Sequence, residues 1–181
     1  MLKASDLLLN FGSNVNPLNF TLNPGTITWF AGKNGSGKST LLLTLMGFQP
    51  LRTGKILYTE TNNSFAYTPQ KPDFAFGLTT QRVLKLAKVD ITGSVAEMLG
   101  IKRFMSTKVT ELSGGEAQRI LLGIAFNKDA KYIFLDEPFA SQDRDSIARI
   151  KELITEQRAQ GKIIVITSHI ELDADQIIEL I

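Results

Sequence analysis

A glycine-rich segment holds the residues best suited to bind a phosphate group. It spans residues 32–39, GKNGSGKS, fits the pattern G-x-x-x-x-G-K-[ST], and lies between an apolar run and an expected helix. Glycines let backbone N–H groups converge on an anion, and the helix start adds its positive dipole end. In this pattern Lys38 reaches the β- and γ-phosphates and Ser39 ligates Mg²⁺. The segment therefore predicts a nucleoside triphosphate site.

Two adjacent acids, Asp136 and Glu137, follow the apolar run 132–135. Ligands of an open α/β sheet sit at the carboxyl ends of its strands. One carboxylate there can hold Mg²⁺ through its water shell, and the next can orient or deprotonate an attacking water. We assign Asp136 to the metal and Glu137 to the water. The alternative is a solvated pair of strand-end acids, which the upstream phosphate loop disfavours.

The stretch LSGGE at residues 112–116 precedes another expected helix. Ser113 as N-cap and Glu116 as partner in a capping box explain two of its residues. They do not explain Gly114 and Gly115, because adjacent glycines in a first helical turn cost stability. We therefore interpret the stretch as a second anion site. A second anion site is useful if it faces a nucleotide that is bound by another copy of the chain, as in a two-fold dimer.

Composition limits the possible classes of protein. The 181 residues suit one domain, and the net charge of +2 is too small to indicate a nucleic-acid partner. The chain has no cysteine and one histidine, which excludes disulfides and multi-histidine zinc sites. No apolar run approaches the roughly 20 residues that span a bilayer, and the N-terminus lacks signal-peptide features. We expect a cytosolic protein whose membrane role would come through a partner.

Apolar strands alternate with helical patterns along the chain, which indicates an α/β fold with a mainly parallel sheet. The expected strands are short strands within residues 2–30, then 55–58, 65–68, 132–135, 163–167 and 176–180. The expected helices are 38–46, a small helical insertion over 79–110, a helix from near residue 113 through residue 125, and 143–160.

The phosphate loop, LSGGE, the Asp-Glu pair and the late His169 resemble the nucleotide-binding subunit of an ABC (ATP-binding cassette) ATPase. The resemblance covers about residues 7–180, and LSGGE separates this family from other P-loop proteins. It implies a P-loop NTPase (RecA-like) core with a mainly parallel sheet, an N-terminal antiparallel β subdomain and a small α-helical insertion. It further implies one ABC ATPase domain over 1–181, with the core and β subdomain at 1–70 and 130–181 and a helical subdomain at 71–129.

The resemblance also implies ATP and Mg²⁺ as cofactors and gives individual residues their roles. Phe11 would stack on adenine, Gln70 would reach Mg²⁺ and the attacking water, and His169 would contact the γ-phosphate. The catalytic set is Glu137, His169, Lys38 and Gln70; the metal set is Ser39, Gln70 and Asp136; the nucleotide-binding set is Phe11, Asn34, Gly35, Ser36, Gly37, Lys38, Ser39, Thr40, Ser113, Gly114 and Gly115. Asp143 matches the family's dimer-contact loop, in which Ala140 and Gln142 replace the usual serine and leucine.

These features favour an ATP-hydrolysing subunit that powers an ABC importer or exporter through nucleotide-driven dimer closure. Its partners would be a transmembrane permease subunit, docked through residues 71–110 and the Gln70 loop, and a second nucleotide-binding subunit in a homodimer or heterodimer. We expect no nucleic acid and a place at the inner face of the cell membrane. Two alternatives are a soluble ABC ATPase, as in iron–sulfur cluster assembly, and a non-enzymatic nucleotide-binding module.

Overall fold

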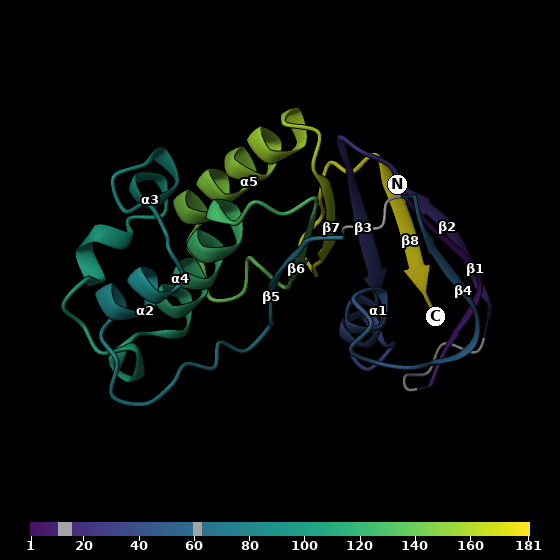
Figure 1. The fold of residues 1–181 in the computed structure, drawn as a ribbon, viewed down its shortest axis with the longest axis horizontal. Coiled ribbons are helices and arrows are strands. Elements are labelled where there is room, and N and C mark those ends of the chain that lie inside the picture. The colour runs from purple at the N-terminus through teal and green to yellow at the C-terminus, as the bar shows by residue number, and fades with distance from the viewer. Residues whose placement is uncertain (11–15, 60–62) are drawn as a thin grey trace.

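The computed structural model describes residues 1–10, 16–59 and 63–181. Figure 1 shows a central parallel sheet with most helices on one face, and with α1 and a second, antiparallel sheet on the other. The parallel sheet has the strand order β5-β6-β7-β3-β8. The antiparallel sheet has the order β2-β1-β4.

All neighbouring strands of the five-stranded sheet are parallel. The interior strands β6 and β7 are buried at every position, as expected for strands covered on both faces. The expected α/β class with a mainly parallel sheet is therefore confirmed. The bounds are β3 (Thr26–Gly32), β5 (Phe65–Thr68), β6 (Tyr132–Asp136), β7 (Ile163–Thr167) and β8 (Gln176–Leu180).

The N-terminal antiparallel sheet is also confirmed. It consists of β1 (Leu2–Leu9), β2 (Leu18–Leu22) and β4 (Leu51–Tyr58). Strand β4 begins at Leu51, four residues before its expected start at residue 55. Residues 52–54 are Arg, Thr and Gly, which resemble a turn, but Leu51 pairs with Leu9 and Thr53 with Leu8, so the strand extends through them. Pairing with a distant strand overrides the local signal.

Helix α1 (Lys38–Leu45) lies between the two sheets, which places the phosphate loop at their junction (Figure 1). Its side chains Leu41, Leu42 and Leu45 are fully buried and join a cluster with residues of β1, β2, β3 and β6. Burying each such side chain stabilises the fold by roughly 1.5–3 kcal/mol. The cluster therefore fixes the direction in which α1 leaves the loop.

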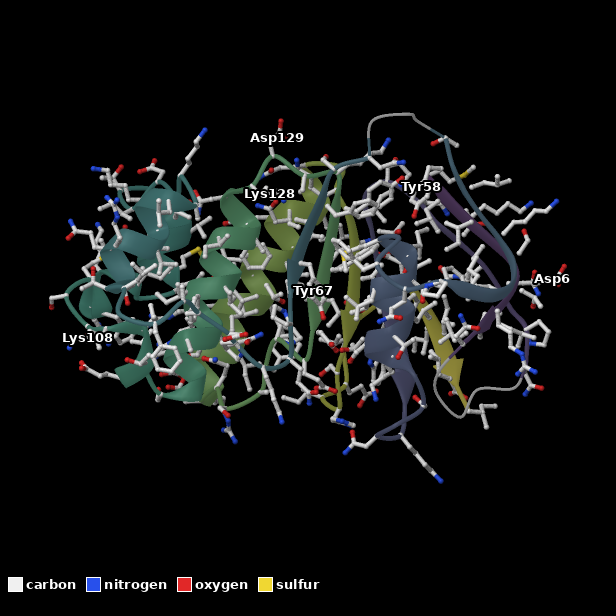
Figure 2. The ribbon with its side chains drawn as sticks, turned by 60° about the horizontal axis from the view of Figure 1, so that its bottom comes forward. Asp6, Tyr58, Tyr67, Lys108, Lys128 and Asp129 are labelled. Atoms are coloured by element: carbon white, nitrogen blue, oxygen red, sulfur yellow. The ribbon has the colours of Figure 1, made fainter. Side chains whose placement is uncertain are left out.

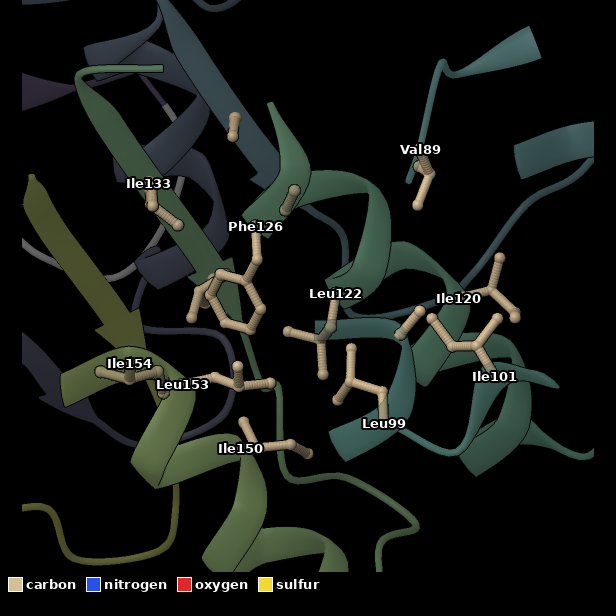
Figure 3. Close-up of a cluster of buried hydrophobic side chains, with 14 of the residues drawn as sticks. Val89, Leu99, Ile101, Ile120, Leu122, Phe126, Ile133, Ile150, Leu153 and Ile154 are labelled. Atoms are coloured by element: carbon tan, nitrogen blue, oxygen red, sulfur yellow. The ribbon is translucent and has the colours of Figure 1, made fainter. Parts of the chain in front are cut away.

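The opposite face of the parallel sheet packs against α4 (Gly114–Asn127) and α5 (Arg144–Ala159). Figure 3 shows Leu122 and Phe126 of α4, Leu153 of α5 and Ile133 of β6 in one buried hydrophobic cluster. The expected helical insertion is a series of short pieces, because glycines at 93 and 100 interrupt it. The pieces are α2 (Thr80–Leu86), α3 (Ser94–Met98) and two 3₁₀ turns, η1 (Ile101–Phe104) and η2 (Val109–Glu111).

None of the helices formed by residues 1–10, 16–59 and 63–181 is both long and apolar enough to cross a bilayer.

Candidate active site

The phosphate-binding loop joins β3 to α1, as the sequence predicts. Gly37 has a left-handed backbone (φ 99°) at the N-cap of α1, and its helix start carries no side-chain cap. A residue with a Cβ is strained in this conformation, so glycine lets the loop turn directly into the helix. The first N–H groups of α1 are therefore available to an anion at the helix start.

The Lys38 side chain folds back over this loop. Its Nζ donates to the carbonyl of Gly32 at 2.8 Å and to that of Lys33 at 3.1 Å, and the residue is 7% exposed. These bonds keep the ammonium group inside the loop. The loop therefore combines helix-start amides with a fixed positive charge, the two features that a polyphosphate requires.

A cavity of about 220 Å³ joins the loop to side chains from distant parts of the chain. It is lined by Asn34, Gly35, Gly37, Lys38, Ser39 and Thr40 from the loop and α1, and by Gln70, Asp136 and Glu137. The structure thus brings together nine of the expected site residues. Ser36 is not in this lining: it is 2% exposed, and its backbone N–H donates to the Lys33 carbonyl at 3.2 Å.

Asp136 ends the buried strand β6 and is held by two neighbouring strands. Its Oδ1 accepts from the Thr167 hydroxyl at 2.5 Å, and the Tyr67 hydroxyl lies 3.5 Å from its Oδ2 (Tyr67 is labelled in Figure 2). Burial, followed by the nearby charge of Asp136, raises the pKa of Tyr67 above its ordinary value. The phenol therefore keeps its proton and acts as a donor toward the Asp136 carboxyl group.

Glu137 follows at a strained position in the backbone, with φ 50°. Its N–H donates to the backbone carbonyl and the hydroxyl of Thr167, at 3.1 and 3.0 Å. The Glu137 carboxylate meets His169: Nε2 lies 3.1 Å from Oε1, and the His169 backbone N–H donates to Oε2 at 3.3 Å. The expected general base and the late histidine are therefore in direct contact.

The LSGGE stretch lies beside the loop of Ser141 and Gln142 that precedes α5, and its residues are not among those that line the phosphate cavity. Ser113 caps α4 and forms a complete capping box with Glu116. The N–H of Ser113 holds the pKa of the Glu116 carboxyl below its usual value. A Cβ on Gly115 would lie 2.4 Å from the Ser141 carbonyl oxygen, whereas one on Gly114 would have only ordinary contacts.

This packing corrects part of the sequence argument. Close approach of the loop after Glu137 requires Gly115 whether or not the turn binds an anion. The Gln142 side chain joins the same contact, because its Nε2 donates to the Gly115 carbonyl at 2.9 Å. Asp143 then caps α5 by accepting from the Ser146 N–H at 2.7 Å, and that bond lowers the pKa of its carboxyl. The second anion site remains a prediction.

Sequence reasoning missed the residues that orient the site. Thr167 is fully buried at the end of β7, and its hydroxyl donates to Asp136 Oδ1 and accepts from the Glu137 N–H. The Tyr67 hydroxyl on β5 donates to Asp136 Oδ2. A polar residue that ends an apolar strand was the available signal for Thr167. The contact of Thr167 with Asp136 could not be predicted, because the sequence alone does not give the order of the strands in the sheet. Phe11, expected to stack on adenine, lies outside the described residues.

The donor set around the cavity fits Mg²⁺. Ser39 and Asp136 both border it and offer a hydroxyl and a carboxylate oxygen. Magnesium takes few protein ligands and completes its shell with water and substrate phosphates. The part of the chain that the structure describes contains no cluster of three or more His, Cys, Asp or Glu residues that could hold a metal ion.

Comparisons with known proteins decide the family. The family described as ABC transporter matches residues 15–140. The chain belongs to this family. Among its relatives, the manganese transport system ATP-binding protein MntB of Listeria monocytogenes is 32% identical over 166 residues, covering 80% of this chain and 69% of MntB. The zinc import ATP-binding protein ZnuC of Magnetococcus marinus is 34% identical over 158 residues, covering 84% of this chain and 60% of ZnuC.

Solved structures of ABC cassettes have the same fold. An ATP-binding subunit of an ABC transporter has a TM-score of 0.87 at 24% identity, covering 99% of this chain and 85% of that chain. The dimeric bacterial ABC transporter cassette MJ0796 has a TM-score of 0.82 at 21% identity, covering 99% and 94%. These likenesses confirm the expected P-loop NTPase fold with its added antiparallel sheet and helices.

Proposed function

We propose that this chain binds and hydrolyses ATP as the nucleotide-binding subunit of a membrane transporter. The observation that carries the proposal is the single cavity in which the P-loop residues Lys38 and Ser39 meet Asp136, Glu137 and Gln70. A loop for phosphates, a carboxylate for a metal and a second acid for water are the parts that phosphoryl transfer to water needs.

Each residue has a definite task in this proposal. Helix-start amides and Lys38 would neutralise the β- and γ-phosphates, and Ser39 and Asp136 would hold Mg²⁺, which would supply further positive charge to offset that of the phosphates. Glu137 orients the water for in-line attack and accepts its proton. Gln70 lines the same cavity and would contact that water. His169, now paired with Glu137, would turn to the γ-phosphate.

Coupling to transport would use a second cassette. ATP held between two copies adds contacts that the open pair lacks, and hydrolysis removes them. Ser113, Gly114 and Gly115 would contact the nucleotide of the partner copy, since they lie outside this chain's own cavity. The dimeric MJ0796 cassette supports such an arrangement. Homodimer and heterodimer both satisfy it.

The permease would dock on the helical insertion, residues 71–110, and on the Gln70 loop, which would hold the chain at the cytoplasmic face of the membrane. A hollow there is lined by Phe74, Phe76, Leu112 and neighbouring residues, and Phe76 is 91% exposed. The names of the relatives MntB and ZnuC put manganese and zinc first among cargoes to be tested. Deleting the gene and measuring cellular manganese and zinc would test both.

The ATPase assignment is tested with Glu137→Gln. We expect turnover to fall about 10²- to 10⁴-fold, the usual contribution of a general base, while ATP binding persists. Glu152→Gln is the matched control, because Glu152 is exposed on α5. Unchanged turnover in Glu137→Gln would remove Glu137 from its role.

The transporter assignment is tested with the same variant. Tagged Glu137→Gln would be purified with ATP and Mg²⁺ from detergent-solubilised membranes. We expect a multi-span membrane protein to copurify in stoichiometric amount. Recovery with soluble proteins alone, and absence of the chain from the membrane fraction, would favour a soluble ABC ATPase instead.

A further inference from the structure

Trp29 is the only tryptophan of the chain, and its indole bonds the turn that carries His169. It lies in the central part of β3, where it pairs with Ile166 of β7 and Ile177 of β8. Its strand neighbours Ile27 and Phe30 are buried in the two cores, but Trp29 is only half-buried. Among the described residues, neither buried cluster includes it. Core packing therefore does not account for this side chain.

The polar end of the indole has a specific partner. Trp29 Nε1 donates to the backbone carbonyl of Ser168 at 3.0 Å. The indole N–H is the only polar group of this side chain, and it can only donate. Ser168 is 3% exposed, and its hydroxyl accepts from the Ile170 N–H at 2.8 Å. The turn that carries His169 is thus held by hydrogen bonds on both sides of the histidine.

The Ser168 carbonyl and the His169 N–H belong to one planar peptide unit. Trp29 holds the oxygen end of that unit, and Glu137 Oε2 accepts from its nitrogen end at 3.3 Å. Holding both ends restricts the movement of this peptide unit, and the His169 side chain leaves the backbone at the Cα atom attached to it. The His169 side chain is 52% exposed, so packing alone cannot hold it.

We propose that Trp29 is a positioning residue for His169: its indole N–H fixes the peptide unit from which the imidazole reaches Glu137. Trp29 is not among the residues that line the described cavity, and its indole N–H bonds the Ser168 carbonyl, so it acts through the turn and not on the nucleotide. The proposal rests on the ATPase function, because the direction of His169 affects a measurable rate only if the site turns over ATP.

The test removes the N–H and keeps the aromatic body. Trp29→Phe would be assayed for ATP hydrolysis, alone and combined with His169→Ala, with folding checked by circular dichroism. A second variant carries 3-benzothienylalanine at position 29, which keeps the bicyclic shape and lacks the donor; it answers the question if phenylalanine disturbs the fold. The expected result is a kcat about five- to tenfold lower at unchanged KM, as for the loss of one hydrogen bond.

The double variant separates positioning from packing. In the His169→Ala background, removing the indole N–H should lower kcat no further, because the two residues act as one unit. A wild-type kcat in the benzothienyl variant overturns the proposal, as does an equal loss with and without His169. Failure of the ATPase function looks different: the wild-type chain does not hydrolyse ATP, or His169→Ala is fully active, before any change at Trp29. Either of those results also overturns this inference.

Discussion

Replacing Gly115 by alanine tests how tightly the loop after Glu137 is packed on α4. The new Cβ would lie 2.4 Å from the Ser141 carbonyl oxygen and 3.4 Å from Gln142 Nε2. An ordinary contact is about 1 Å longer than the first of these, and the obstacle is backbone, which cannot rotate away. Overpacking of this kind costs about 1–3 kcal/mol. We therefore expect Gly115→Ala to destabilise the chain although alanine favours a helix by up to about 1 kcal/mol.

Gly114→Ala is the matched control, because its Cβ would meet Ser141 Oγ at 3.7 Å, an ordinary contact. Both variants gain helix propensity in the same turn, so the difference between them isolates the clash. Urea unfolding followed by circular dichroism, without nucleotide, measures both free energies of unfolding. We expect Gly115→Ala to be less stable than Gly114→Ala by about 1–3 kcal/mol. Equal stability of the two variants would refute the packing argument.

Three further variants test other contacts of the site. Thr167→Val removes the buried hydroxyl that donates to Asp136, so urea unfolding should show a loss of about 1–3 kcal/mol; wild-type stability would contradict this. Gln142→Leu removes the hydrogen bond to the Gly115 carbonyl, so the free energy of unfolding should fall by about 0.5–1.5 kcal/mol. An unchanged free energy of unfolding would contradict this. The lowered pKa of Glu116 stabilises the fold above about pH 4.5 and ceases to do so as pH falls through the folded-state pKa. Glu116→Gln should therefore flatten the acid side of the melting-temperature profile, and an unchanged profile would argue against this linkage.

The sequence was most informative where chemistry and local structure coincide. The phosphate loop required a strand before it and a helix after it, and β3 and α1 lie there. The acids Asp136 and Glu137 were placed correctly because a continuous apolar run predicts a buried strand and its carboxyl end. The capping box was likewise readable, since Ser113 and Glu116 are only three residues apart.

Contacts between distant segments could not be predicted. Thr167 bonds Asp136 because β6 and β7 are neighbours, and nothing local records that order. Gly115 looked like half of an anion site because its tight neighbour, Ser141, lies 26 positions away and belongs to another loop. The sequence pattern predicts a role toward ATP for each site residue, and the experiments proposed above test these roles.

The place of β3 in the sheet has a consequence for how the chain folds. Within the described sheet, β3 is flanked only by β7 and β8, whose residues follow it by more than 130 positions. Because synthesis runs from the N-terminus, β3 has no neighbouring strand to pair with until residues 163–180 have left the ribosome. Pairing across such a separation is slow. The nascent chain should therefore acquire nucleotide affinity only near the end of its synthesis, and pieces that stop before β7 should expose an unpaired, aggregation-prone strand.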